Sequence, residues 1–139
     1  MKCLPLLASA VLLFAGCSSV QIQKGSKTAL TRRQRVYVEQ RTNDSASLDA
    51  RIVNELKTLG YDASAGPLTM MPDDTELVVT YDARWEWDFR HYLIDLGVTV
   101  RPASSFDVLA RARYFHPGVT RKPPEEMIHE LLAPLFRRK

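Results

Sequence analysis

The chain has 139 residues, of which 45% are hydrophobic and 25% are charged, with a formal net charge of +3 and two cysteines. This composition excludes an intrinsically disordered chain and is typical of a globular protein. The length suffices for one domain with one hydrophobic core.

The N-terminal segment has the layout of a secretory leader. Lys2 precedes an apolar run over residues 4–15, which is shorter than the roughly 20 residues that span a bilayer. The run ends in Leu-Phe-Ala-Gly-Cys at residues 13–17. This stretch resembles the lipobox of bacterial lipoproteins. The resemblance implies cleavage before Cys17, a diacylglyceryl group on its thiol and an acyl chain, such as palmitate, on the freed amine.

We therefore expect a leader over 1–16 and a mature chain from Cys17 onward. Removing Lys2 leaves 18 basic and 16 acidic side chains, a formal charge of +2, which argues against nucleic acid or another polyanion as a partner. Cys3 leaves with the leader, so the mature domain has no free thiol, as suits an oxidising compartment. Ser18 stands where Asp retains many Gram-negative lipoproteins in the inner membrane. The resemblance thus implies the outer membrane, with the domain in the periplasm by default.

Residues 17–34 are expected to form the lipidated cysteine and a flexible tether. The segment is polar, contains four basic residues and no acidic one, and shows no helical or strand period. Its basic side chains suit contact with anionic lipid head groups, but a merely solvated linker explains the same composition. Both interpretations stay open.

Residues 35–139 are expected to form a single domain, and its first half has simple periodic signals. Residues 35–40 are rich in β-forming side chains and predict a strand. Leu48, Ile52, Leu56 and Leu59 form one apolar stripe, which predicts an amphipathic helix that Gly60 ends. A second strand is expected to start at Tyr61, followed by a loop over 66–74.

The second half predicts three strands and a helix. Apolar and polar side chains alternate over 76–88, 92–100 and 106–114, which favours an antiparallel meander with one apolar face. Residues 124–135 predict a helix with a kink or an end at Pro134. The expected fold class is α+β, in the element order β-α-β-β-β-β-α. We expect a two-layer sandwich in which a mixed sheet containing this meander is covered on one face by two helices.

The strand predicted over residues 76–88 shows a second resemblance. Residues 76–81 read Glu-Leu-Val-Val-Thr-Tyr and residues 83–88 read Ala-Arg-Trp-Glu-Trp-Asp. Together with the lipobox, this strand is similar to a family of small uncharacterised proteobacterial lipoproteins, akin to lipoprotein domains of unknown function with an α/β sandwich. The resemblance implies the fold and the location, and it implies no activity.

No catalytic or metal-binding motif is recognisable. His91, His116 and His129 lie far apart and lack ligand spacing, so we expect surface histidines and no metal site. The sequence has no nucleophile elbow and no phosphate-binding glycine loop. These observations predict a protein that is not an enzyme and has no cofactor.

Two surfaces are candidate sites. Trp85 and Trp87 share the apolar parity of their strand, which favours a core role, while Trp87 near the strand end is the candidate rim of a ligand site beside Met70 and Met71. The alternate side chains of these strands, which point to the other side of the sheet, form a charged face. It is either a solvated, salt-bridged surface or a docking face. Its candidate residues are Arg84, Glu86, Arg111 and Arg113.

Two functional hypotheses follow. The first is a lipid-anchored cell-envelope protein without enzymatic activity, an accessory or scaffold that docks another envelope component, such as an envelope protein, through the charged sheet face or a sheet edge. The alternative is a small binding module for an envelope glycan or lipid that uses the Trp87 rim. The sequence specifies neither the partner nor the oligomeric state.

Overall fold

The computed structural model describes residues 18–25, 30, 34–117 and 121–137. Cys17 and the expected leader lie outside these residues. The elements are β1 (Ser19–Lys24), β2 (Arg35–Glu39), α1 (Leu48–Thr58), β3 (Asp62–Gly66), a 3-10 turn (Leu68–Met70), β4 (Leu77–Trp87), β5 (His91–Pro102), β6 (Ala110–Phe115) and α2 (Pro124–Phe136).

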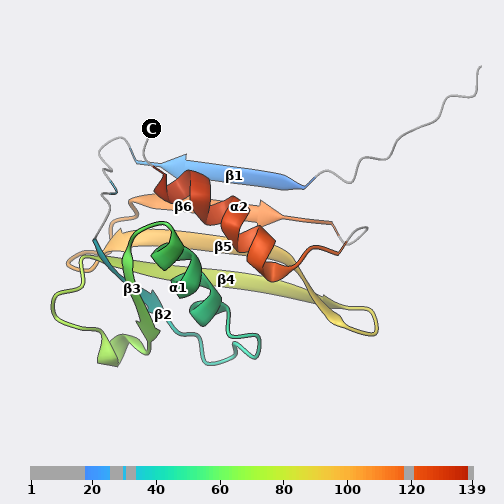
Figure 1. Cartoon of the computed structure of the whole chain (residues 1–139), viewed down its shortest axis with the longest axis horizontal. Helices are drawn as coiled ribbons and strands as arrows, with labels where there is room; N and C mark the ends of the chain where they lie inside the picture. Colours follow the sequence, from blue (N-terminus) through green and yellow to red (C-terminus); the bar gives the residue numbers. More distant parts are fainter. Residues whose placement is uncertain (1–17, 26–29, 31–33, 118–120, 138–139) are drawn as a thin grey trace, which may run out of the picture.

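The strands form one open mixed sheet in the order β1-β6-β5-β4-β2-β3. β2 is parallel to β3, because the α1 crossover returns the chain in the same direction. β2 is also parallel to β4, which follows β3 after the segment that contains the 3-10 turn. β4 with β5, β5 with β6, and β6 with β1 are antiparallel. The expected α+β class is confirmed, since the described chain contains this six-stranded sheet and two α-helices (Figure 1).

β1 is a strand that the sequence analysis does not predict. It lies inside the expected tether and pairs along its whole length with β6, from Ser19 opposite Phe115 to Lys24 opposite Ala110. A flexible spacer is therefore wrong for residues 19–24, and the expected element order lacks one strand. The physical reason is that backbone groups at the edge of β6 stabilise this pairing, and a short polar strand shows little of that in its own sequence.

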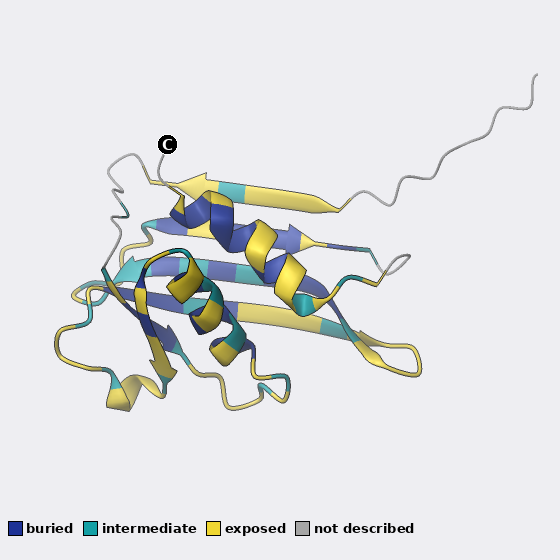
Figure 2. Cartoon of the chain, in the orientation of Figure 1, coloured by how far each residue is buried: buried dark blue, intermediate teal, exposed yellow. Residues whose placement is uncertain are grey.

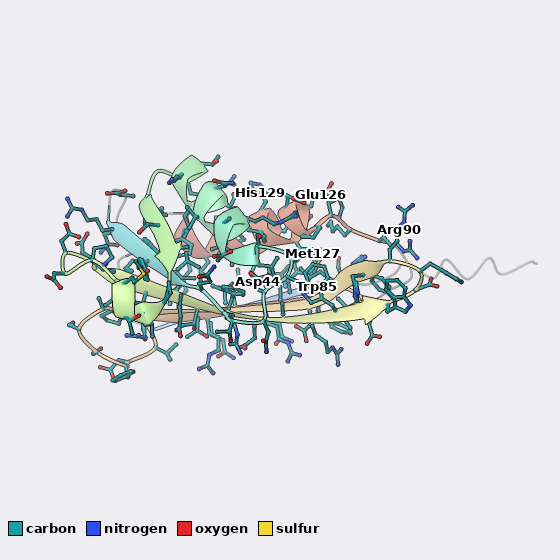
Figure 3. The ribbon with its side chains drawn as sticks, turned by 90° about the horizontal axis from the view of Figure 1, so that it is seen from below. Asp44, Trp85, Arg90, Glu126, Met127 and His129 are labelled. Atoms are coloured by element: carbon teal, nitrogen blue, oxygen red, sulfur yellow. The ribbon has the colours of Figure 1, made fainter. Side chains whose placement is uncertain are left out.

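Both helices lie on the same side of the sheet in the two views of Figures 1 and 3. The apolar stripe predicted for α1 faces the sheet, and Gly60 follows the helix with a φ of 94°, a left-handed conformation that costs glycine little. α2 continues two residues beyond Pro134. The helices bury a common core against the sheet, which includes Val36, Val38, Leu48, Ile52, Leu56, Val79, Leu96, Val98, Tyr114, Ile128, Leu131, Leu132 and Leu135.

Two strand predictions need correction. A β-bulge between Arg84 and Trp85 shifts the register with β5, so that Leu93 lies opposite Trp85 and the simple alternation of β5 ends there. The last strand begins at Ala110 and not at Phe106, whose side chain is 89% exposed. Phe106 lies instead under the guanidinium of Arg101, 5.1 Å from its ring centroid.

The helices do not reach the far end of β4. Figure 2 shows that β4 changes from buried to exposed toward the β4–β5 turn. Trp85 is half-buried against the core, but Trp87 is 65% exposed, so a core role is wrong for Trp87. Strand parity fixes the face on which a side chain lies, whereas burial also requires another element to cover that face.

Candidate functional site

The sheet face away from the helices brings the predicted charged residues together. Arg84, Glu86, Arg111 and Arg113 are all exposed. The sheet register places Arg113 opposite Gly97 and Arg111 opposite Thr99 on the neighbouring strand, while Arg84 lies opposite Asp95. Figure 3 shows side chains that end in nitrogen on this side of the sheet. The three arginines thus share one surface, with Glu86 nearer the β4–β5 turn.

Two arginines of this sheet face, Arg84 and Arg111, differ from Arg113 in having no acidic partner among the described residues. The Asp95 carboxylate is largely buried and accepts two hydrogen bonds from Arg113, one of them 2.9 Å long from Nε. The hydrogen bonds to Asp95 and its charge raise the pKa of Arg113. Within the described part of the chain, Arg84 and Arg111 form no ion pair. Their charges are therefore available to an acidic partner surface.

A small pocket of about 170 Å³ lies on the helix side, between β4 and the segment that leads into α1. Its lining includes Arg41, Asp44, Tyr81 and Trp85, and Figure 3 shows Asp44 and Trp85 near one another. Ligand sites for small molecules are usually larger, on the order of 300–1,000 Å³. The size alone makes this pocket a weak candidate for a ligand site.

The polar groups of this pocket bond to one another. Asp44 accepts the Tyr81 hydroxyl at 2.6 Å and the backbone N–H groups of Ala46 and Asp49 at 3.1 and 3.2 Å. Arg41 donates to the Tyr81 carbonyl at 3.2 Å and to the Asp82 carboxylate at 2.7 Å. The network joins the start of α1 to β4, so its role is structural. The sequence signal for this role is the cluster of helix-capping side chains at residues 43–47.

We expect Tyr81→Phe to flatten the loss of stability at alkaline pH. Burial, followed by the hydrogen bond to Asp44, raises the pKa of Tyr81. The folded state thus holds its proton above the ordinary tyrosine pKa of about 10, where the unfolded chain releases it, so stability is complete below that pH and declines above it. Urea unfolding between pH 8 and 11 measures the slope. Burial also raises the pKa of Tyr37, which keeps a residual slope.

The matched control is Tyr92→Phe, at a half-buried tyrosine of β5. At neutral pH, Tyr81→Phe costs about 1.5–3 kcal/mol of unfolding free energy, because one hydrogen bond to a carboxylate is lost. If the alkaline slope of Tyr81→Phe matched that of the unmodified protein, the Tyr81 proton would not be linked to folding.

The β4–β5 hairpin end is the other surface with unusual exposure. Trp87 is 65% exposed and Phe89 is 90% exposed, and Phe89 has a left-handed φ of 54°. The ring of His91 lies against Trp87, with 4.8 Å between the ring centroids. The sequence analysis singles out Trp87 but not Phe89, because a turn residue has no period that marks it.

Trp87 and the loop of Met70 and Met71 cannot form one rim. The 3-10 turn Leu68–Met70 precedes β4, whereas Trp87 ends it, and the two lie at opposite ends of the sheet in Figure 1. A strand of 11 residues spans roughly 35 Å at about 3.3 Å per residue. A shared ligand site of these residues is therefore wrong, and Trp87 stands with the hairpin alone.

The three histidines lie apart. His91 and His129 are exposed, and His129 contacts Glu55 at 2.7 Å, but His116 is only 7% exposed, so a surface position is wrong for it. No group of three or more His, Cys, Asp and Glu side chains among the described residues could hold a metal ion. Neither helix in that part of the chain is long and apolar enough to cross a bilayer.

The comparisons with known proteins identify a fold. No protein-family model and no curated protein sequence matches the chain. The arrangement defines an α+β protein with an open mixed sheet, and solved structures share it. A leucine-to-methionine variant of the PelC dodecamer from Paraburkholderia phytofirmans is similar to the chain, with a TM-score of 0.68 and 19% identity over 88% of this chain and 100% of that one.

A PelC dodecamer from the same organism in another crystal form has a TM-score of 0.62 and 17% identity, over 85% of this chain and 94% of that one. At this level of identity the likeness concerns the fold alone.

Proposed function

We propose that the chain is a lipid-anchored protein of the outer membrane, with its domain in the periplasm, that acts as a non-enzymatic scaffold. It docks an acidic surface of another envelope component onto the sheet face of Arg84, Arg111 and Arg113. The two-layer sandwich, with β4, β5 and β6 as an antiparallel meander, serves as the rigid platform. The observation that carries the proposal is that Arg84 and Arg111 have no ion pair among the described residues and lie on a sheet face that no helix covers.

The anchor follows from the lipobox resemblance at residues 13–17. Cys17 stands two residues before the start of β1, so a lipid there ties the edge of the sheet closely to the membrane. Each buried methylene contributes about 0.8 kcal/mol, and the three acyl chains that the resemblance implies exceed the two signals needed for stable anchoring.

A second copy of this chain is one candidate for the docked component. The similar PelC structures are dodecamers. The described chain also has two open sheet edges, β1 and β3, at which a neighbouring copy can bind. The crosslinking experiment described next distinguishes binding of a second copy from docking of a different protein.

The first test is in-cell photo-crosslinking. A photoreactive residue at Thr99, which lies opposite Arg111 in the sheet, leaves Arg84 and Arg111 in place in the full-length protein. We expect one discrete adduct, and we expect Arg84→Glu with Arg111→Glu to reduce it at least about tenfold, because two attractions to an acidic surface become repulsions. The adduct mass distinguishes a second copy of the chain from a different protein.

The charge-matched control is Lys57→Glu with Arg137→Glu. Both side chains are exposed, and they lie at the ends of α1 and α2, on the helix side. This variant keeps the adduct if the sheet face is the docking surface. An adduct that survives the reversal at Arg84 and Arg111 rules out docking through this face.

The alternative function is a binding module for an envelope glycan or lipid. The exposure of Trp87 favours it, because an exposed indole can stack on a sugar or enter a lipid layer. A glycan is tested by titrating the tryptophan fluorescence with peptidoglycan fragments. The absence of any spectral shift at millimolar concentration would exclude such a ligand.

A further inference from the structure

The sheet register relates the β4–β5 hairpin to the expected anchor. Ser19 of β1 lies opposite Phe115, Phe115 opposite Asp95, and Asp95 opposite Arg84, so these four residues form one row across the sheet. β5 runs in the same direction as β1, since both are antiparallel to β6. The residues of β5 before Asp95 therefore extend past this row on the same side as the start of β1.

The hairpin extends at least as far past this row of residues as the chain before Ser19 can extend to Cys17. From Arg84 to Trp87, β4 continues three residues past the row, or about 10 Å. The two steps from Ser19 back to Cys17 span at most about 7 Å. The turn beyond Trp87 thus lies at least as far toward the membrane as the lipidated residue. Figure 1 shows the start of β1 and the β4–β5 turn at the same end of the sheet.

The hairpin tip presents two aromatic side chains that are mostly exposed. Phe89 is 90% exposed and adopts a positive φ of 54°, which is unfavourable for a bulky residue. Trp87 is 65% exposed and lies two residues away. Tryptophan, with its amphipathic ring, is enriched where membrane and water meet. Both rings gain apolar surroundings if the tip enters a bilayer.

The protein itself holds the tip in this conformation. Arg121, in the segment before α2, donates to both the backbone carbonyl and the carboxylate of Asp88 at 3.0 Å. Its guanidinium also lies over the ring of Tyr92, 5.6 Å from the centroid. The turn is therefore arranged before any contact with a partner, which lowers the entropic cost of inserting it.

The charges at the tip nearly cancel. Glu86 and Asp88 are balanced by Arg90 and by Arg121, which forms an ion pair with Asp88. Figure 3 places Arg90 at the far end of the hairpin, where its guanidinium can reach a lipid phosphate. Attraction to anionic lipid is therefore weak, and aromatic burial is the main source of affinity.

We propose that the β4–β5 hairpin is a second membrane contact, in which Trp87 and Phe89 enter the interfacial region of the lipid bilayer that holds the Cys17 anchor. The proposal rests on the proposed lipidation. A lipid on a short chain leaves the domain free to rotate, and a second contact fixes its orientation. The charged sheet face is then held at a constant angle to the membrane.

Fluorescence quenching by brominated lipids tests the contact. The chain has two tryptophans, so Trp85→Phe leaves Trp87 as the reporter, and Trp87→Phe leaves half-buried Trp85 as the matched control. The full-length lipidated variants are reconstituted into vesicles of phosphatidylethanolamine and phosphatidylglycerol with bromine on the acyl chains. We expect Trp87 to be quenched at least about twice as strongly as Trp85. Phe89→Ser in the Trp85→Phe background reduces that quenching, and 0.5 M salt leaves it unchanged.

The outcomes are distinguishable. Protein that floats with the vesicles while Trp87 and Trp85 are quenched equally overturns the hairpin contact and leaves the anchor intact. Quenching that salt abolishes overturns insertion in favour of an electrostatic contact. Protein that fails to float, with no lipid mass on the Cys17 peptide, overturns the proposed anchoring itself. Circular dichroism of each variant verifies the fold.

Discussion

Replacing Cys17 with Ser is expected to abolish the incorporation of labelled palmitate. It is also expected to lower the amount of the protein in the outer-membrane fraction by about 100-fold or more. This result is expected because the lipobox resemblance assigns the thiol of Cys17 as the acceptor of the diacylglyceryl group. Three acyl chains exceed the two signals that stable anchoring needs, whereas the domain surface by itself provides only weak contacts. Metabolic labelling followed by membrane fractionation measures both effects.

Cys3→Ser is the matched control, because it removes the chain's other cysteine from within the expected leader. It leaves labelling and fractionation unchanged. Cys17 precedes the first strand by two residues, so its replacement leaves the core of the domain intact. Palmitate labelling that persists in Cys17→Ser would contradict lipidation at this residue.

Leu96→Ala lowers the free energy of unfolding by about 3–4 kcal/mol. Leu96 has no exposed surface and lies in the middle of β5, under the helices and within the common core. The substitution removes buried methyl groups and leaves a cavity, which the surrounding side chains fill only in part. For a domain of this size the change is a large share of the total stability, which is typically 5–15 kcal/mol. Urea unfolding at neutral pH measures it.

Leu68→Ala provides the comparison at an exposed leucine. Leu68 is 39% exposed in the 3-10 turn before β4, and its truncation costs about 0.5 kcal/mol or less. An equal loss at the two positions would mean that the sheet and the helices do not form the core described here.

The local sequence pattern determined most elements. β2, α1, β4, β5 and α2 lie close to their expected ranges, since each has a burial period that its own residues display. Gly60 ended α1 for a local reason as well, because its left-handed φ is a property of the glycine itself. The α+β class follows from these elements.

The candidate surfaces could be predicted from the sequence only in part. Strand parity placed Arg84, Arg111 and Arg113 on one sheet face, and the register agrees. Parity could not show that Asp95 pairs with Arg113 and leaves Arg84 and Arg111 available, because cross-strand ion pairs depend on side-chain geometry. The sequence pattern could not predict the exposure of Phe89 either, because a turn residue has no periodic signal.

The sequence by itself determined the positions of β2, α1, β4, β5 and α2 and the expected anchor, because those signals are carried by neighbouring residues. Only the tertiary structure decided that residues 19–24 join the sheet and that the end of β4 is uncovered. Pairing at a sheet edge depends on the backbone of β6, and coverage depends on where the helices end, so both are set by residues distant in the chain. The pairing of β1 with β6 also places the start of β1 and the hairpin of Trp87 at the same end of the sheet.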